Sequence, residues 1–257
     1  MIPLRDHNPT LRTPVVTIGL LVTLALVWVF VQGAGFDPYA IATSVCDLGL
    51  IPGELTGKAP VGTAIPIARG LTCIVDASPL NWLTPLTSMF LHGGWGHLLF
   101  NGLFLWVFGN NVEDSMGRIR FLVFYVLCGL SAAALQVAVA PASPVPMVGA
   151  SGAIAGVLGG YLVLYPRARV DVLVPLVFMW PIVSLPAYVM LLLWIGFQII
   201  SALPQLLAVS RTVSSGVAFF AHIGGFVTGA VLVRFFARRS RVEKRKSLAR
   251  EYHPRHL

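Results

Sequence analysis

The stretch GASGAIAGVLGG, residues 149–160, combines one hydroxyl group with a stripe of small residues inside an apolar segment. Gly152, Gly156 and Gly160 recur at a spacing of four, so they share one face of the predicted helix. Small residues at this spacing let two helices approach closely in lipid, where the hydrophobic effect does not hold helices together. We therefore expect this segment to pack tightly against a second helix.

A matching stripe lies in AHIGGFVTG, residues 221–229, where Gly225 and Gly229 follow His222. If the two segments pack along their glycines, Ser151 and His222 face each other at one depth. A serine hydroxyl attacks well only when an adjacent base removes its proton. The spacing therefore predicts Ser151 as a nucleophile and His222 as its base.

The chain as a whole has the composition of a membrane protein. Of its residues 56% are hydrophobic and only 11% are charged, and the mean hydropathy is +0.81. A bilayer core about 30 Å thick needs roughly 20 apolar residues per helical span. Segments of this kind lie near residues 14–32, 95–112, 119–139, 150–166, 185–205 and 216–236. The pattern predicts an all-α polytopic membrane protein, a bundle of six transmembrane helices with a long external loop between helices 1 and 2.

One further apolar stretch, residues 172–183, contains Pro175 and Pro181. Proline disrupts a helix interior, and the stretch is short for a span. It is open at this point whether it is a re-entrant or interfacial segment or a seventh span. The first apolar stretch, near residues 14–32, is too long for a signal peptide and is expected to be a retained anchor.

Lysine and arginine are distributed unevenly between the two sides of the predicted bundle. With six spans, all but three of the 18 Lys and Arg residues fall on the side of the termini, the exceptions being Lys58, Arg69 and Arg211. Cytoplasmic flanks are enriched in these residues. We therefore expect both termini in the cytoplasm and the loop of residues 33–91 outside.

This topology divides the chain into three parts. Residues 1–13 are a short cytoplasmic segment, residues 14–236 the membrane domain and residues 237–257 a basic tail that we expect to be poorly ordered. The net charge of +8 comes mainly from this tail. Because the tail directly follows a predicted span, it indicates topology and contact with anionic lipids rather than nucleic-acid binding.

The external loop is rich in glycine and proline between apolar residues, which favours an ordered, membrane-hugging structure. It also contains Cys46 and Cys73. An oxidising compartment would permit a disulfide between them, although two free thiols are equally consistent with the sequence. Cys128, in the third predicted span, is most simply a packing residue.

Polar residues cluster where hydrocarbon makes them costly, which marks them as functional candidates. In LHGGWGHLLFN, His92 lies at the membrane edge, and His97 and Asn101 share one helix face four residues apart. Gly149 removes side-chain bulk next to Ser151. Each residue alone has a plainer explanation, because serine often bonds a backbone carbonyl and histidine can bridge helices. Their joint position in the outer halves of separate helices favours catalysis.

Four motifs together resemble the rhomboid intramembrane proteases. They are HGGWGHLLFN, GNNVEDSMGRIRF, GASG and AHIGGFVTG, and the similarity runs from about Trp82 to Gly229. The resemblance implies that Ser151 is the nucleophile and His222 the general base. It further implies that His97 and Asn101, with the backbone N–H of Ser151, stabilise the oxyanion.

By the same resemblance, His92 and Gly149 support the site from the substrate side. Two departures from the family pattern stand out: Trp82 lacks the arginine that often follows it, and Ala155 replaces an aromatic residue that can stack on the base. How His222 is oriented is therefore an open question.

The acidic residues of the helical core, Glu113, Asp114 and Asp171, are expected at the cytoplasmic ends of their helices, too far from His222 to orient it. A catalytic dyad is therefore expected rather than a triad. Glu113 is expected to fix the loop that leads to the third helix.

The resemblance implies single-pass membrane proteins as substrates, cut near the outer membrane boundary without a cofactor or a metal. Helix-weakening residues would help a substrate to unwind into the site. Membrane lipids are the other expected partner, and a bacterial inner membrane the expected location. The physiological substrate, the cleavage-site preference and the oligomeric state are left open. Movement of the fifth span, entered through residues 185–187, is one hypothesis for substrate entry.

Two other functions are consistent with parts of the pattern. A rhomboid-like protein without activity would act as a binding or trafficking scaffold, but such proteins lack the serine or the histidine. A metal or proton transporter would use His92, His97 and His222 as ligands or relays, and would need carboxylates or cysteines nearby.

Overall fold

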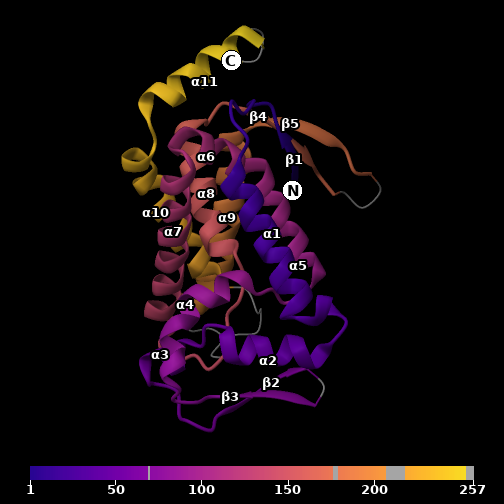
Figure 1. Cartoon of the computed structure of the whole chain (residues 1–257), viewed down its shortest axis with the longest axis vertical. Coiled ribbons are helices and arrows are strands. Elements are labelled where there is room, and N and C mark those ends of the chain that lie inside the picture. Colours follow the sequence, from indigo (N-terminus) through magenta and orange to yellow (C-terminus); the bar gives the residue numbers. More distant parts are fainter. Residues whose placement is uncertain (69, 176–178, 207–217, 253–257) are drawn as a thin grey trace.

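The computed structural model describes residues 1–68, 70–175, 179–206 and 218–252, and helices occur at each range where the sequence predicts a span. They are α1 (Val15–Phe30), the continuous run of α5 (Trp95–Phe104), the π-helical turn η4 (Leu105–Gly109) and α6 (Asn110–Met116), then α7 (Arg118–Val139), α8 (Ser151–Leu164), α9 (Ala187–Leu206) and α10 (Phe219–Phe236). Figure 1 shows them side by side in one bundle.

Three of these helices are long and apolar enough to cross a bilayer by the usual criteria. They span Arg118–Val139, Ala187–Pro204 and Phe219–Phe236 among the described residues. Two more, Val15–Phe30 and Ser151–Leu164, are apolar but shorter. The fold is thus that of a membrane protein, while the number of six spans stays a prediction.

The segment between α1 and α5 is folded over its described residues. It contains η1 (Gly33–Gly35), α2 (Pro38–Leu48), α3 (Pro52–Thr56), the hairpin of β2 (Ala64–Ala68) and β3 (Leu71–Ile74), η2 (Pro79–Leu83), α4 (Thr84–Thr87) and η3 (Ser88–Phe90). A disulfide joins Cys46 of α2 to Cys73 of β3. The structure therefore resolves the choice between a disulfide and free thiols in favour of the disulfide.

The described part of residues 172–183 contains strand residues and no helix, so a seventh helical span was wrong, while a re-entrant or interfacial position stays a prediction. Strand β4 (Arg169–Leu173) pairs antiparallel with β5 (Ile182–Pro186), and β1 (Ile2–Asp6) pairs antiparallel with the other edge of β4. The all-α prediction was also wrong in this respect, because the fold is mostly helical but includes two small sheets.

The strand character of β4 has a local cause. Val170 and Val172 alternate with polar or partly exposed neighbours and are fully buried, which is the period of a strand. Between them, Asp171 accepts a hydrogen bond from Nε of Arg5 at 2.7 Å and contacts the ring of His7 at 2.9 Å. Burial alone would raise the pKa of the Asp171 carboxyl, but these hydrogen bonds lower it to about 2.

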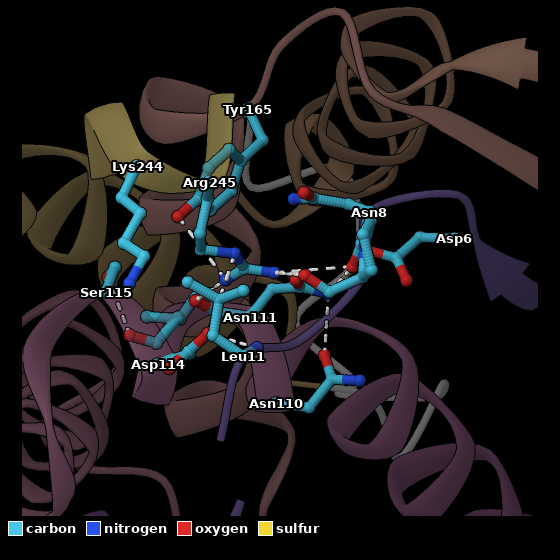
Figure 2. Close-up of polar contacts among 12 residues, drawn as sticks. Asp6, Asn8, Leu11, Asn110, Asn111, Asp114, Ser115, Tyr165, Lys244 and Arg245 are labelled. Atoms are coloured by element: carbon cyan, nitrogen blue, oxygen red, sulfur yellow. Dashed lines mark hydrogen bonds and ion pairs between the residues drawn. The ribbon is translucent and has the colours of Figure 1, made fainter. Parts of the chain in front are cut away.

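The basic tail is helical over its described residues, so the expectation of poor order was wrong there. Helix α11 (Arg239–Tyr252) carries Arg245, whose side chain is only 1% exposed. Its guanidinium donates to the backbone oxygens of Asn8, Pro9 and Asn111. Figure 2 shows Arg245 between these segments, with the ring of Tyr165 beside it. Residues 253–257 lie outside the described residues.

Glu113 has a different role from the one predicted. Its carboxylate accepts hydrogen bonds from the backbone N–H groups of Val16 and Thr17, at 3.0 and 2.8 Å, and from the hydroxyl of Thr17. The first N–H groups of a helix lack partners within the helix, and a negative charge there is favourable. Glu113 therefore caps α1 from α6 instead of fixing the loop toward α7.

Helices α8 and α10 pack along their glycines, which confirms the predicted contact. A Cβ atom on Gly225 would lie 1.9 Å from the carbonyl oxygen of Gly152, and one on Gly229 would lie 1.9 Å from that of Gly156. Both distances are far shorter than any real Cβ contact. The two backbones therefore touch directly, and a side chain at either position would force them apart.

The third predicted member of the stripe, Gly160, contacts side chains of both neighbouring helices. A Cβ atom there would lie 3.2 Å from the ring of Phe124 on α7 and 3.5 Å from the side chain of Val233 on α10. The direct backbone contact at this level is made by Gly159, where a Cβ atom would lie 2.0 Å from the backbone oxygen of Phe226 on α10. With 3.6 residues per turn, the contact face advances by three residues after a step of four.

The bundle has chemically different ends. Figure 1 shows β4, β5 and α11 at one end and α2, α3 and the β2–β3 hairpin at the other. Lys58 follows α3 at the disulfide-bearing end. Arg69 and Arg211, which the sequence places on the same side, lie outside the described residues.

Candidate active site

Ser151 occupies the first position of α8, and Gly149 shapes the turn before it. Gly149 has φ +129°, a conformation that residues with a side chain rarely adopt. A Cβ atom there would lie 2.7 Å from Cε1 of His97. Gly149 therefore leaves room for the ring of His97 near the Ser151 hydroxyl.

Ser151 and His222 form a hydrogen-bonded pair, with Nε2 of His222 2.8 Å from Oγ of Ser151. The direct backbone contact of α8 with α10 explains this pairing, because Gly152 and Gly225 bring the two helices together at this level. A histidine at this distance can accept the serine proton during attack.

The second ring nitrogen of His222 is bonded to Gln198 of α9. Nδ1 of His222 lies 2.8 Å from Oε1 of Gln198. An amide oxygen can only accept a hydrogen bond, so Nδ1 carries the proton and Nε2 presents its lone pair to Ser151. Gln198 therefore selects the tautomer that a general base needs.

An aromatic ring lies beside the base, but it comes from α9 rather than from α8. The ring of Trp194 is 5.7 Å from that of His222 between centroids, with an angle of 39° between the planes. Ala155, where the family can place an aromatic residue, is fully buried in the core. Trp194 and Gln198, one turn apart on α9, thus hold the ring of His222 in its orientation, which the sequence alone left open.

His97 and Asn101 lie one turn apart on α5 and line the same cavity as Ser151. The backbone N–H of Gly93 donates to Nδ1 of His97 at 3.3 Å, so the proton of the neutral ring is on Nε2. Nδ2 of Asn101 is buried and has no hydrogen-bond partner among the described residues. Both side chains can therefore donate to an oxygen atom that enters the cavity.

His92 does not line this cavity. It is fully buried, and its ring packs edge-on against the ring of His97 with 5.1 Å between centroids. The side-chain amide of Gln32 accepts from the backbone N–H of His92 and donates to its carbonyl oxygen, both at 2.8 Å. His92 therefore supports His97 from behind, and Gln32 fixes the backbone that carries it.

The cavity has a volume of about 320 Å³ and is bounded by α5, α7, α8, α9 and α10 with the segments before α5 and α8. This volume lies at the lower end of the range for ligand sites. Its walls are mainly apolar. The polar side chains discussed above that line it are Ser151, His222, His97, Asn101 and Gln198.

The acidic residues of the core are engaged elsewhere. None of the described residues that line the cavity is acidic. Glu113 caps α1, and Asp171 is bound to Arg5 and His7. Over the described ranges, no three His, Cys, Asp or Glu side chains converge as metal ligands.

Sequence reasoning missed Gln198, Trp194 and Gln32. A signal for Gln198 was present, since it is a polar residue within an apolar span, which is the same criterion that selected His97 and Asn101. Trp194 precedes it by four residues and shares its helix face. Gln32 left no comparable signal, because it binds only backbone atoms.

Comparison with known proteins gives a family match. A model described as a rhomboid domain matches residues 79–239, more than half of the chain. The chain is 44% identical to the rhomboid protease GluP of Bacillus subtilis over 81 residues, which cover 32% of this chain and 15% of that protein. It is 38% identical to the putative rhomboid protease YdcA of the same organism over 81 residues, covering 32% of this chain and 40% of that protein.

A longer alignment is found with rhomboid-like protein 11, a chloroplastic protein of Arabidopsis thaliana. The two chains are 29% identical over 157 residues, covering 59% of this chain and 51% of that protein. The chain thus spans about half or less of the length of these relatives.

Proposed function

This chain belongs to the rhomboid family, and we propose that it is an intramembrane serine endopeptidase with a Ser151–His222 dyad. The observation that carries the proposal is the 2.8 Å hydrogen bond between Oγ of Ser151 and Nε2 of His222. This bond lies in a mainly apolar cavity with two further N–H donors, His97 and Asn101, and a chain of this composition is an integral membrane protein.

The reaction begins with attack of the Ser151 hydroxyl on a substrate carbonyl carbon. His222 accepts the hydroxyl proton on Nε2, while Gln198 holds the proton on Nδ1. Negative charge develops on the substrate oxygen. The N–H groups of His97 and Asn101, with the backbone N–H of Ser151, are the donors that would stabilise it, and such preorganised donors contribute about 3 kcal/mol each.

The second half of the reaction needs water. Protonated His222 delivers its proton to the departing amine, and an acyl group is left on Ser151. Water then enters the cavity, gives up a proton to His222 and attacks the acyl carbon. The bond from that carbon to Oγ of Ser151 breaks, and Oγ takes the proton back from His222. Within the part of the chain that the structure describes, no carboxylate lines the cavity, so the amide of Gln198 takes the orienting position that an acid holds in a triad.

The substrates we propose are single-pass membrane proteins, cut near the outer membrane boundary. A helix shields its own peptide bonds, so segments with glycine, proline or small residues are favoured because they unwind more easily. Trp194 and Gln198 lie on α9, so movement of α9 toward an entering substrate would also alter the contacts of His222.

We further propose six spans in a bacterial inner membrane, with both termini in the cytoplasm. Two chemically independent features support this orientation. Arginines concentrate at the end of the bundle that holds α11, as on cytoplasmic flanks. The Cys46–Cys73 disulfide lies at the opposite end, as expected in an oxidising compartment.

The test is cleavage of a model transmembrane substrate in liposomes by the unmodified chain and by Ser151→Ala and His222→Ala. A fluorophosphonate probe, read by mass spectrometry, reports on Ser151 directly. We expect cleavage and labelling in the unmodified chain and loss of both in each variant. Equal cleavage by all three proteins would reveal a contaminating protease, and absence of cleavage and labelling across several substrates would favour a scaffold.

A further inference from the structure

A second cavity, of about 530 Å³, lies where α6 meets α7. It is separated from the catalytic cavity by most of the α5–α6 run, since 17 residues between His97 and Asp114 correspond to about 25 Å of helix. Five arginines line it and define what we call the arginine pocket: Arg12, Arg118, Arg120, Arg238 and Arg241. They come from the segment before α1, the start of α7 and the start of α11.

The acidic residues in the wall are hydrogen-bonded to other groups. Glu113 and Asp114 also line the cavity. Both carboxylate oxygens of Glu113 are used to cap α1. Asp114 accepts from the backbone N–H of Leu11 at 2.8 Å and lies 3.7 Å from Nε of Arg245 (Figure 2). Within the described ranges, no ion pair joins any of the five arginines to a carboxylate.

Arg241 lacks an acceptor in this pocket. Its Nη1 atom is buried, has no hydrogen-bond partner among the described residues and packs against the backbone at Gly117. Burial and the neighbouring charges of Arg12 and Arg238 lower the pKa of Arg241. A buried guanidinium N–H without an acceptor is costly, as is the repulsion among like charges.

The helix that begins in the pocket increases the positive potential. Helix α7 starts at Arg118, its first turn contains no acidic residue, and Gly117 before it offers no side-chain cap. The N-terminus of a helix carries a partial positive charge, so Arg118 and Arg120 in the first turn are unfavourably placed. An anion in the pocket would offset both the arginine charges and this helix end.

We propose that the arginine pocket is a binding site for a phosphate-bearing anion. Guanidinium groups donate paired N–H bonds to phosphate oxygens, and several arginines around one cavity fit such a group. The position of the pocket favours a phospholipid headgroup as the source of the phosphate. Helices α7 and α10 are both long and apolar enough to span a membrane, and α7 begins and α10 ends within two residues of pocket arginines. A soluble phosphate compound has the same chemistry and is the other source. This proposal does not depend on proteolytic activity.

The test is the thermal unfolding of the full chain in a neutral detergent, titrated separately with short-chain phosphatidylglycerol, short-chain phosphatidylcholine and inorganic phosphate. The pocket variant is Arg118→Gln/Arg241→Gln. The matched control is Arg167→Gln/Arg239→Gln, which removes the same charge from two exposed arginines outside the pocket.

We expect phosphatidylglycerol to raise the unfolding temperature of the unmodified chain and of the control, and to act on the pocket variant only at roughly 10-fold higher concentration or more. Without an anion, the pocket variant should unfold at the same or a higher temperature, because it has lost like-charge repulsion. The single variant Arg12→Gln, at an exposed side chain, repeats the titration if the double variant is unstable.

Stabilisation by phosphatidylglycerol but not by inorganic phosphate identifies lipid as the source, and stabilisation by both identifies free phosphate. Either result supports the pocket if the control variant responds like the unmodified chain. Two results would overturn the proposal. One is an equal loss of the phosphatidylglycerol effect in the pocket variant and the control variant. The other is that neither phosphatidylglycerol nor inorganic phosphate raises the unfolding temperature of the unmodified chain more than phosphatidylcholine does.

Discussion

Gln198 connects α9 to the reacting serine through a single side chain. Its oxygen bonds Nδ1 of His222, whose Nε2 bonds Ser151. It contacts neither the serine nor the expected path of the substrate carbonyl, so we regard it as a positioning residue. Its contribution should therefore be visible in turnover rather than in substrate binding.

We predict that Gln198→Leu lowers kcat about 10-fold and leaves KM nearly unchanged, because one buried hydrogen bond that fixes the tautomer is lost. The rate of fluorophosphonate labelling at Ser151 should fall by a similar factor. Gln198→Glu, which keeps an acceptor at this position, should retain most of the labelling rate.

The control for this prediction is Gln136→Leu, which removes a buried glutamine of α7 that does not line the catalytic cavity. It should leave kcat within about twofold. Gln198 would have a purely structural role if kcat fell by the same factor in Gln198→Leu and Gln136→Leu. The same conclusion would follow if Gln198→Glu did not retain the labelling rate.

The sequence indicates which residues line the cavity where a polar side chain stands out against apolar neighbours. Ser151, His222, His97 and Asn101 could all be selected in this way, and the structure brings them to one cavity. Gln198 met the same criterion, but its partner is 24 residues away on another helix. Which face of α9 points inward depends on helix packing, and local sequence does not encode that.

At the scale of helices, the contact between α8 and α10 is set by backbone proximity. We predict that Gly229→Ala reduces stability by about 1 to 3 kcal/mol, because its Cβ atom would lie 1.9 Å from the oxygen of Gly156. The displaced helices would also separate Ser151 from His222. Thermal unfolding and the fluorophosphonate labelling rate should therefore both decrease.

The matched control is Gly19→Ala in α1, where a Cβ atom would meet nothing within 4 Å. Alanine is a better helix former than glycine, so this variant should be as stable as the unmodified chain or slightly more so. If Gly229→Ala and Gly19→Ala behave alike, the two helices do not require glycine at their contact.

Elements with a strong period were predictable, and those fixed by distant partners were not. The long apolar runs predicted the helix positions, because each run indicates a helix without any knowledge of what the helix packs against. Strands β1, β4 and β5 contain only five residues each, and the pairing of β1 with β4 joins segments about 165 residues apart. The prolines near β5 also resembled helix breaks, although a strand edge accommodates them equally well.

At the scale of the whole molecule, the N-terminal strand is tied to the helical core by a buried carboxyl group. Asp6 accepts a hydrogen bond from the hydroxyl of Tyr161 on α8 at 2.6 Å and another from the side chain of Asn111 on α6. Burial raises the pKa of the Asp6 carboxyl from 3.8 to about 7, although the hydrogen bond from Tyr161 and the positive charge of Arg245 counteract the rise.

This shift makes global stability depend on pH in a definite direction. A folded-state pKa above the unfolded value means that the contribution of Asp6 is greatest below about pH 3.8 and is lost as the pH rises through about 7. The loss is at most about 4 kcal/mol, at roughly 1.4 kcal/mol per pKa unit.

We predict that Asp6→Asn flattens the decrease in unfolding temperature between pH 5 and about pH 8. Asp47→Asn, at an exposed acid of α2, should leave that decrease as it is in the unmodified chain. The measurement is thermal unfolding in detergent across this range. Parallel curves for the unmodified chain and Asp6→Asn would contradict a raised pKa at Asp6.

The contacts of Arg245 have a consequence for the order in which the molecule can be completed. Asn8 precedes Arg245 by 237 residues, and β1 likewise pairs with β4, which is synthesised much later than β1. A ribosome delivers the N-terminal segment first, yet that segment acquires its buried cation only after α11 has been synthesised. The helices that surround the proposed dyad all precede α11, so they can assemble before Arg245 reaches Asn8 and Pro9, and these contacts of α11 form after the other described helices have been synthesised.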